Sequence, residues 1–197
     1  MKTTVLIGSL ILLSACTEST VESVNQEKEF VESIVSKMTL DEKLSQMVQD
    51  APYNERLGIP RMMYSECLHG LWLEGATVFP QAIALGSTWN PELIKEMTSY
   101  IAEEARSVGV THCYSPNLDV SIGDARYGRI EESYGEDPYL VSRMGVAFIK
   151  GLQGEGDEYL DENHIIATAK HFVAYPENRT GLNGAFSDVS LRDCMRY

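Results

Sequence analysis

The sequence has few positively charged residues. Its 197 residues include 16 Lys and Arg against 29 Asp and Glu, a formal net charge of −13 at pH 7. A protein that neutralises nucleic-acid phosphates needs a basic face. Electrostatic docking on anionic lipid needs positive charge as well. The composition therefore argues against nucleic acid as a partner and against electrostatic membrane docking. It suits a neutral substrate or an exported protein kept soluble by its charge.

The apolar run at the N-terminus, Val5 to Leu13, is too short to span a bilayer as a mature helix. One Lys precedes the run and small residues follow it, which is the pattern of an export signal. The run ends in Leu-Ser-Ala-Cys16, which resembles the lipobox of bacterial lipoproteins. The resemblance implies a signal peptide over residues 1–15, lipidation at Cys16, and a mature protein anchored to a membrane of the bacterial periplasm or cell envelope. The alternative is an ordinary signal peptide with an incidental Cys16. Residues 16–29 are polar and are predicted to form a tether.

Cysteines are also few. With Cys16 assigned to lipidation, Cys67, Cys113 and Cys194 remain. Three well-separated cysteines do not make a disulfide framework or a C-x-x-C metal site, so we expect them to be buried thiols. The four histidines have no ligand-like spacing, and neither a G-x-G-x-x-G fingerprint nor a G-x-S-x-G elbow occurs. We therefore expect no metal and no cofactor.

Several segments have the signals of amphipathic helices. Asn90-Pro91 and Asp137-Pro138 each combine a capping residue with Pro at the first helical position. Their expected buried stripes are Ile94, Met97, Ile101, Ala105 and Val108 in the first helix and Leu140, Met144, Ala147, Phe148 and Leu152 in the second. A further helix is predicted after Thr39, where Glu42 completes a capping box, and a last one after Ser190.

Short apolar segments that suit strands lie between these helices, at 61–64, 110–114 and 165–172. Strands that alternate with helices are typical of βαβ units and a parallel sheet, so the predicted fold class is α/β. Such folds carry their chemistry on loops at the carboxyl ends of strands. Polar clusters occupy these positions after all three predicted strands: Glu66 with His69, the charged segment 126–137, and Lys170 with His171. This coincidence predicts a functional site.

Four collinear stretches resemble the glycoside hydrolase family 3 enzymes, which include β-glucosidases and β-xylosidases. They are "RLGIPRMMYSECLHG", "ATVFPQAIALGSTWNPEL", "PNLDVSIGDARYGRIEESYGEDPYL" and "IIATAKHFVAYPENR". The resemblance covers roughly residue 38 to the C-terminus. It implies that residues 30–197 form part of an N-terminal (β/α)8 TIM-type barrel, because a complete barrel typically needs about 250 residues.

Matched to the family motifs, Glu66, Arg129, Lys170 and His171 are expected to line the subsite of the reacting sugar. A pyranose ring presents a fan of hydroxyls, which charged donors and acceptors bind more strongly than neutral groups. Glu66 can accept from hydroxyls, Arg129 and Lys170 can donate, and His171 can donate from one ring nitrogen while a neighbour holds the other. Neighbouring charges among Arg126, Glu131, Glu132 and Glu136 are expected to brace Arg129.

The resemblance also implies a retaining mechanism, in which a carboxylate nucleophile and a carboxylic acid act on the glycosidic bond. Both groups are expected beyond Tyr197, so no catalytic residue is assigned within the chain. We expect an N-terminal fragment of an exo-acting β-glycosidase that acts on β-linked oligosaccharides. The alternatives are a catalytically inactive sugar-binding lipoprotein, and a structural lipoprotein for which the polar clusters would be coincidence.

Asp188 superficially resembles the family's nucleophile motif, but it lies only eighteen residues after Lys170, in a linker where no nucleophile is expected. Residues 174–188 contain no His, which counts against the β-N-acetylglucosaminidase branch. Glu66 stands where many β-glucosidases have Asp, which favours xylosidase or arabinosidase-type members.

Overall fold

The computed structural model describes residues 24–48, 51–177, 180–187 and 189–194. It divides into two compact units, Met1–Arg61 and Met62–Tyr197. The predicted signal peptide, Cys16 and Asp188 lie outside the described residues. Among the described residues, no helix is long and apolar enough to cross a membrane.

The first unit contains the helix predicted after Thr39. Residues 24–35, which include the described end of the predicted tether, are helical, and α2 follows at Leu40–Gln46. The predicted capping box is present, since the Thr39 hydroxyl accepts from the Glu42 N–H at 3.2 Å and the Glu42 carboxylate accepts from the Thr39 N–H at 2.8 Å. Arg56 then pairs with the same carboxylate. The capping box therefore defines where α2 begins, and the Arg56 pair ties the loop after α2 to this end of the helix.

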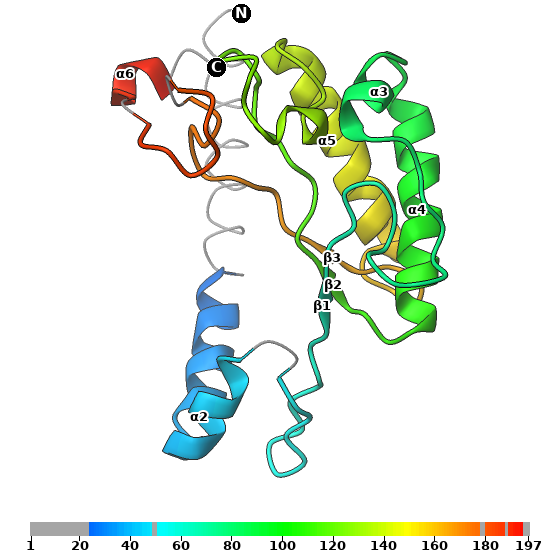
Figure 1. The fold of residues 1–197 in the computed structure, drawn as a ribbon. Helices are drawn as coiled ribbons and strands as arrows, with labels where there is room; N and C mark the ends of the chain where they lie inside the picture. Colours follow the sequence, from blue (N-terminus) through cyan, green and yellow to red (C-terminus); the bar gives the residue numbers. More distant parts are fainter. Residues whose placement is uncertain (1–23, 49–50, 178–179, 188, 195–197) are drawn as a thin grey trace, which may run out of the picture. The chain divides into compact units, whose positions relative to one another are not determined.

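The second unit is built on a short parallel sheet in the order β1-β2-β3 (Figure 1). Its strands are β1 (Tyr64–Ser65), β2 (His112–Cys113) and β3 (Ile166–Ala167). Tyr64 pairs with His112, and His112 pairs with Ile166. The predicted α/β class and parallel sheet are confirmed, but the strands are shorter than predicted. Pro116 has no N–H to donate to a ladder. Beyond β2 and β3 the two segments stay joined by an isolated bridge between Asn117 and Lys170 and by a hydrogen bond from the Thr168 N–H to the Ser115 carbonyl.

The helices of the second unit are α3 (Ala82–Gly86), α4 (Pro91–Ser107), α5 (Pro138–Gln153) and α6 (Leu191–Cys194), with short 3-10 turns η1 (Ile130–Glu132) and η2 (Gly156–Glu158). The two predicted caps are present: the Asn90 side chain accepts from the Leu93 N–H, and that of Asp137 from the Tyr139 N–H. Helices α4 and α5 lie together on one side of the sheet (Figure 1). Together with the strands they form two consecutive βαβ units.

The core lies between these two helices and the sheet. Both predicted stripes are buried except Val108, which is 45% exposed. That prediction was wrong because α4 ends at Ser107, so the helical periodicity no longer applies. The helices approach closely at Gly151, where an added Cβ would lie 1.9 Å from the Thr98 hydroxyl oxygen. This close packing joins α4 and α5 into one helix layer.

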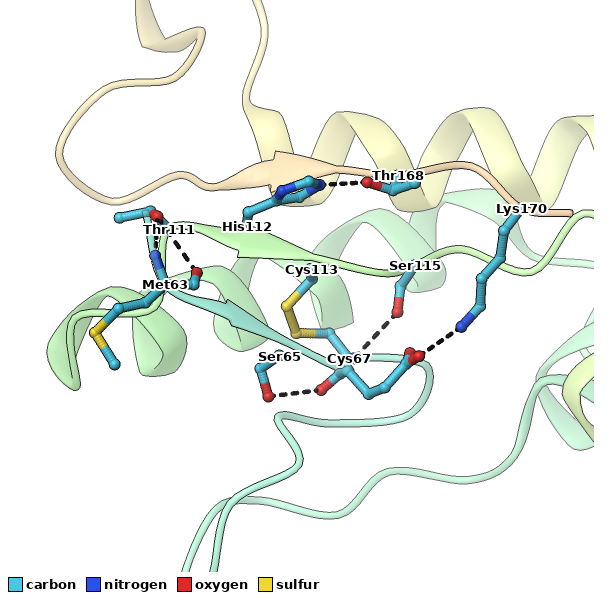
Figure 2. The surroundings of a disulfide bond; sticks show 10 residues. Met63, Ser65, Cys67, Thr111, His112, Cys113, Ser115, Thr168 and Lys170 are labelled. Atoms are coloured by element: carbon cyan, nitrogen blue, oxygen red, sulfur yellow. Dashed lines mark hydrogen bonds and ion pairs between the residues drawn. A yellow bond between two sulfur atoms is a disulfide. The ribbon is translucent and has the colours of Figure 1, made fainter. Parts of the chain in front are cut away.

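The prediction of three buried thiols was wrong. Cys67 and Cys113 form a disulfide with Cα atoms 5.7 Å apart, and both are fully buried (Figure 2). The remaining Cys194 is a free thiol and partly exposed. The two paired residues are 46 positions apart, a separation that spans one strand–helix–strand unit. They meet because β1 and β2 are neighbours in register, which the cysteine spacing alone does not reveal.

Candidate functional site

The structure brings the four predicted site residues together at the carboxyl ends of the strands. The Lys170 ammonium, after β3, lies 2.6 Å from the Glu66 carboxylate, after β1. The Arg129 guanidinium, in the loop after β2, lies 3.2 Å from Nε2 of His171. Segments far apart in the sequence thus converge because the three strands are parallel and adjacent.

Glu66 and Lys170 form a half-buried ion pair, with side chains 29% and 14% exposed. The pair engages only Oε1 of Glu66. Within the part of the chain that the structure describes, the buried Oε2 has no hydrogen-bond partner. Because a buried carboxylate oxygen without a partner is costly, this atom is suited to accept a hydrogen bond from a ligand hydroxyl.

Arg129 is fixed by a bidentate pair with Glu132, at 2.8 Å from Nε to Oε1 and 2.5 Å from a terminal nitrogen to Oε2. The two residues are three positions apart in sequence, and the turn η1 between them brings their side chains together. Burial tends to raise the pKa of Glu132, but hydrogen bonding and the positive charge of Arg129 outweigh it, so the pKa lies below its ordinary value. The same pairing raises the pKa of Arg129. The expected brace is therefore Glu132, while Arg126 pairs with Asp124 instead.

His171 is held by Asp119, which sequence reasoning did not assign to the site. Nδ1 of His171 lies 2.7 Å from the Asp119 carboxylate, and the His171 backbone N–H donates to the same group at 3.3 Å. An arginine can only donate, so Nε2 of His171 accepts from Arg129 and the ring proton sits on Nδ1, facing Asp119. The Asp119 side chain is only 3% exposed. A carboxylate buried beside β2 needs a partner, which is the signal that could have identified it.

Tyr175 is a second residue that the sequence did not single out. Its ring centroid lies 4.3 Å from that of His171, and the Arg129 guanidinium carbon lies 5.5 Å from the centre of the same ring. Its hydroxyl donates to the Asn183 side chain at 3.0 Å. Tyr175 therefore packs against two of the predicted site residues at once, from the segment that follows Lys170 and His171.

A cavity of about 570 Å³ opens beside this cluster. Glu66 and Arg129 are among the residues that line it, and Lys170 and His171 contact these two side chains. The wall of the cavity consists of Glu66, Leu68, His69, Gly70, Leu71, Trp72, Leu73, Thr77, Val78, Gln81, Arg129, Glu131, Glu132 and Asn183. A charged end with an apolar wall is the usual make-up of a small-molecule site. Among the described residues, no group of three or more His, Cys, Asp or Glu could hold a metal ion.

Comparison with known proteins identifies the family. The model of the glycosyl hydrolase family 3 N terminal domain matches residues 7–193. The chain belongs to this family. A "Beta-xylosidase" from Formosa agariphila is 71% identical over 167 residues, covering 82% of this chain and 23% of that protein.

Solved structures of the family agree in fold. A β-glucosidase from Erythrobacter marinus has 40% identity and a TM-score of 0.67 over 77% of this chain and 20% of its own. An exo-1,3/1,4-β-glucanase from a Pseudoalteromonas species has 25% identity and a TM-score of 0.74 over 84% of this chain and 27% of its own. The chain thus spans about a fifth to a quarter of the length of the relatives it matches.

Proposed function

We propose that this chain supplies the sugar subsite of an exo-acting, retaining β-glycosidase, with β-xylosides as the preferred substrate class. The observation that carries the proposal is the convergence of Glu66, Arg129, Lys170 and His171 from three strand ends beside one cavity. Glu66 offers an unpartnered carboxylate oxygen to sugar hydroxyls, and Arg129 offers donors held in place by Glu132. Lys170 and His171 act mainly by positioning these two groups.

The preference for xylosides has two supports. Glu66 stands where many β-glucosidases of the family have Asp, and the relative that is 71% identical to this chain is named a β-xylosidase.

The charge of the cavity bears on the class of sugar rather than on its identity. The carboxylates that line the cavity, Glu66, Glu131 and Glu132, favour a neutral sugar over an anionic one. A β-glucoside is the alternative substrate within the same class.

Hydrolysis with retention needs two further carboxyl groups about 5–5.5 Å apart, one as nucleophile and one as acid/base. The family resemblance implies that both groups lie beyond Tyr197, and we place them there. Three carboxylates of the cluster instead hold its cations and the His171 ring: Glu66 pairs with Lys170, Glu132 with Arg129, and Asp119 with His171. In this proposal the strands and helices described are the first units of a (β/α)8 barrel.

The proposal also includes export and anchoring through Cys16. The N-terminal pattern of the sequence supports it. A disulfide between Cys67 and Cys113 suits such a location, because disulfides persist in oxidising compartments outside the cytosol.

The test uses the protein purified with every residue that its gene encodes. We expect hydrolysis of 4-nitrophenyl β-xyloside faster than of the β-glucoside, with β-xylose as the first product in proton NMR. Glu66→Gln should abolish turnover. Xylose binding without turnover of any aryl glycoside would support a sugar-binding lipoprotein instead, and absence of both would refute the proposal.

A further inference from the structure

The cavity extends beyond the charged cluster. At about 570 Å³ it falls in the range of roughly 300–1,000 Å³ typical of pockets for drug-sized ligands. Trp72, Leu73 and Val78 also line it, and these side chains are 80%, 49% and 77% exposed. These side chains are not part of the hydrophobic core. The cavity thus has a second, apolar region that sugar hydroxyls do not explain.

Hydrogen bonds and a close backbone approach fix the conformation of the loop that carries these side chains. The Trp72 N–H donates to the Glu66 carbonyl at 2.8 Å, which ties the backbone of Trp72 to that of the residue that faces the sugar. Gly70 has φ +125° and lies so close to the Thr77 carbonyl that an added Cβ would come within 2.2 Å of it. Thr77 is in turn held by the Glu104 carboxylate at 3.1 Å. Apolar side chains in the wall of a cavity, carried by a loop fixed in this way, are suited to contact a ligand.

The chemistry of the cavity limits what this surface can contact. Its charged end binds hydroxyls, and its carboxylates disfavour anionic ligands. A second pyranose ring, linked to the first, presents hydroxyls at its edge and C–H groups on its face. An indole supplies a large, flat apolar area for such a face, together with an N–H at its rim.

We propose that Trp72, flanked by Leu73 and Val78, is the platform for the second sugar ring of a β-linked disaccharide, the ring that leaves on hydrolysis. This inference rests on the proposed function, because it takes the charged cluster as the subsite of the first ring. It assigns Trp72 the role of a specificity-determining residue for the leaving group.

The test compares xylose with β-1,4-xylobiose in calorimetric titrations of the protein with every residue that its gene encodes. An active enzyme would be titrated with a non-hydrolysable thio-linked xylobiose. The wild type should bind the disaccharide more tightly than the monosaccharide. Trp72→Ala should weaken disaccharide binding about 5- to 10-fold and leave xylose binding unchanged, while Trp72→Phe should retain most of the disaccharide affinity. Trp89→Phe is the matched control, because Trp89 is 65% exposed and does not line the cavity.

The outcomes separate this inference from the proposed function. Xylose binding that depends on Glu66, with equal disaccharide affinity in wild type and Trp72→Ala, would overturn the platform alone. Equal loss of both ligands in Trp72→Ala would also overturn it, because Trp72 would then only support the loop. Failure of the wild type to bind either sugar would overturn the proposed function and the platform with it.

Discussion

Two arginines three residues apart in the same charged segment have different surroundings. The Arg126 side chain is 77% exposed and pairs with Asp124, two residues earlier. The Arg129 side chain is 21% exposed and pairs with Glu132, three residues later. In the sequence, each of the two arginines has a carboxylate within three residues. In the structure only Arg129 also contacts His171 and Tyr175, which come from the segment after β3.

The comparison shows that a local ion pair does not identify a site. Hydrogen bonding from Arg126 lowers the pKa of Asp124 to about 2, and the pKa of Glu132 is lowered as well. The exposed pair is worth little because water screens it. Contacts from distant parts of the chain, together with a place in the wall of a cavity, distinguish Arg129 from Arg126.

The largest expected effect is on sugar binding when each arginine is removed. Arg129→Ala should weaken xylose binding about 10- to 100-fold, since a hydrogen bond to a charged group contributes about 1.5–3 kcal/mol. Arg126→Ala should change the Kd less than about twofold. Calorimetric titration of both variants provides the measurement. Similar losses in the two variants would mean that the segment acts through its overall charge.

A smaller effect is expected from Asp119→Asn, which retains the size of the side chain. In the carboxylate, one oxygen accepts from the His171 backbone and the other from the His171 ring. The amide has NH2 in place of one of these oxygens, so one of the two N–H groups loses its acceptor. We expect sugar affinity to fall about 3- to 10-fold. The ¹⁵N shifts of the His171 ring should change from a pure Nδ1–H tautomer to a mixture. Unchanged shifts would show that Arg129 alone fixes the ring.

The third prediction concerns pH. The pKa of Glu132 is lower in the folded protein than in the unfolded chain, so the pair stabilises the fold above the unfolded pKa and loses this effect as pH falls through the folded pKa. Glu132→Gln should therefore lower the free energy of unfolding by about 1 kcal/mol at neutral pH. Urea unfolding across acidic pH should show the gap to wild type closing. Asp124→Asn, in the exposed pair, is the control and should change stability less.

Sequence reasoning succeeded where the determining signals are local. Asn90 with Pro91 and Asp137 with Pro138 specify where α4 and α5 begin. The alternation of strands and helices was enough to predict a parallel sheet, and a parallel sheet places polar residues after its strands at a single edge. The meeting of Glu66, Arg129, Lys170 and His171 follows from that topology.

The features that were missed depend on tertiary contacts. The Cys67–Cys113 disulfide requires β1 and β2 to be adjacent and in register. The roles of Asp119 and Tyr175 require the chain after β3 to lie against the loop after β2. Spacing along the sequence carries no information about such pairings, so a polar residue in an apolar context was the only available signal for Asp119.

The smallest expected effect separates the ring of Tyr175 from its hydroxyl. Tyr175→Phe removes the hydroxyl, with its hydrogen bond to Asn183, and keeps the ring against His171 and Arg129. Sugar affinity should change less than about twofold, whereas Tyr175→Leu should weaken it about 3- to 5-fold through the loss of ring contacts. Combining Tyr175→Leu with each arginine variant tests the comparison directly. Arg126 has no such aromatic contact among the described residues, so Tyr175→Leu should lower the sugar affinity of the Arg126→Ala protein about 3- to 5-fold, as it does in wild type. In the Arg129→Ala protein, Tyr175→Leu should have little further effect on sugar affinity. Equal effects in both backgrounds would show that Tyr175 acts independently of Arg129.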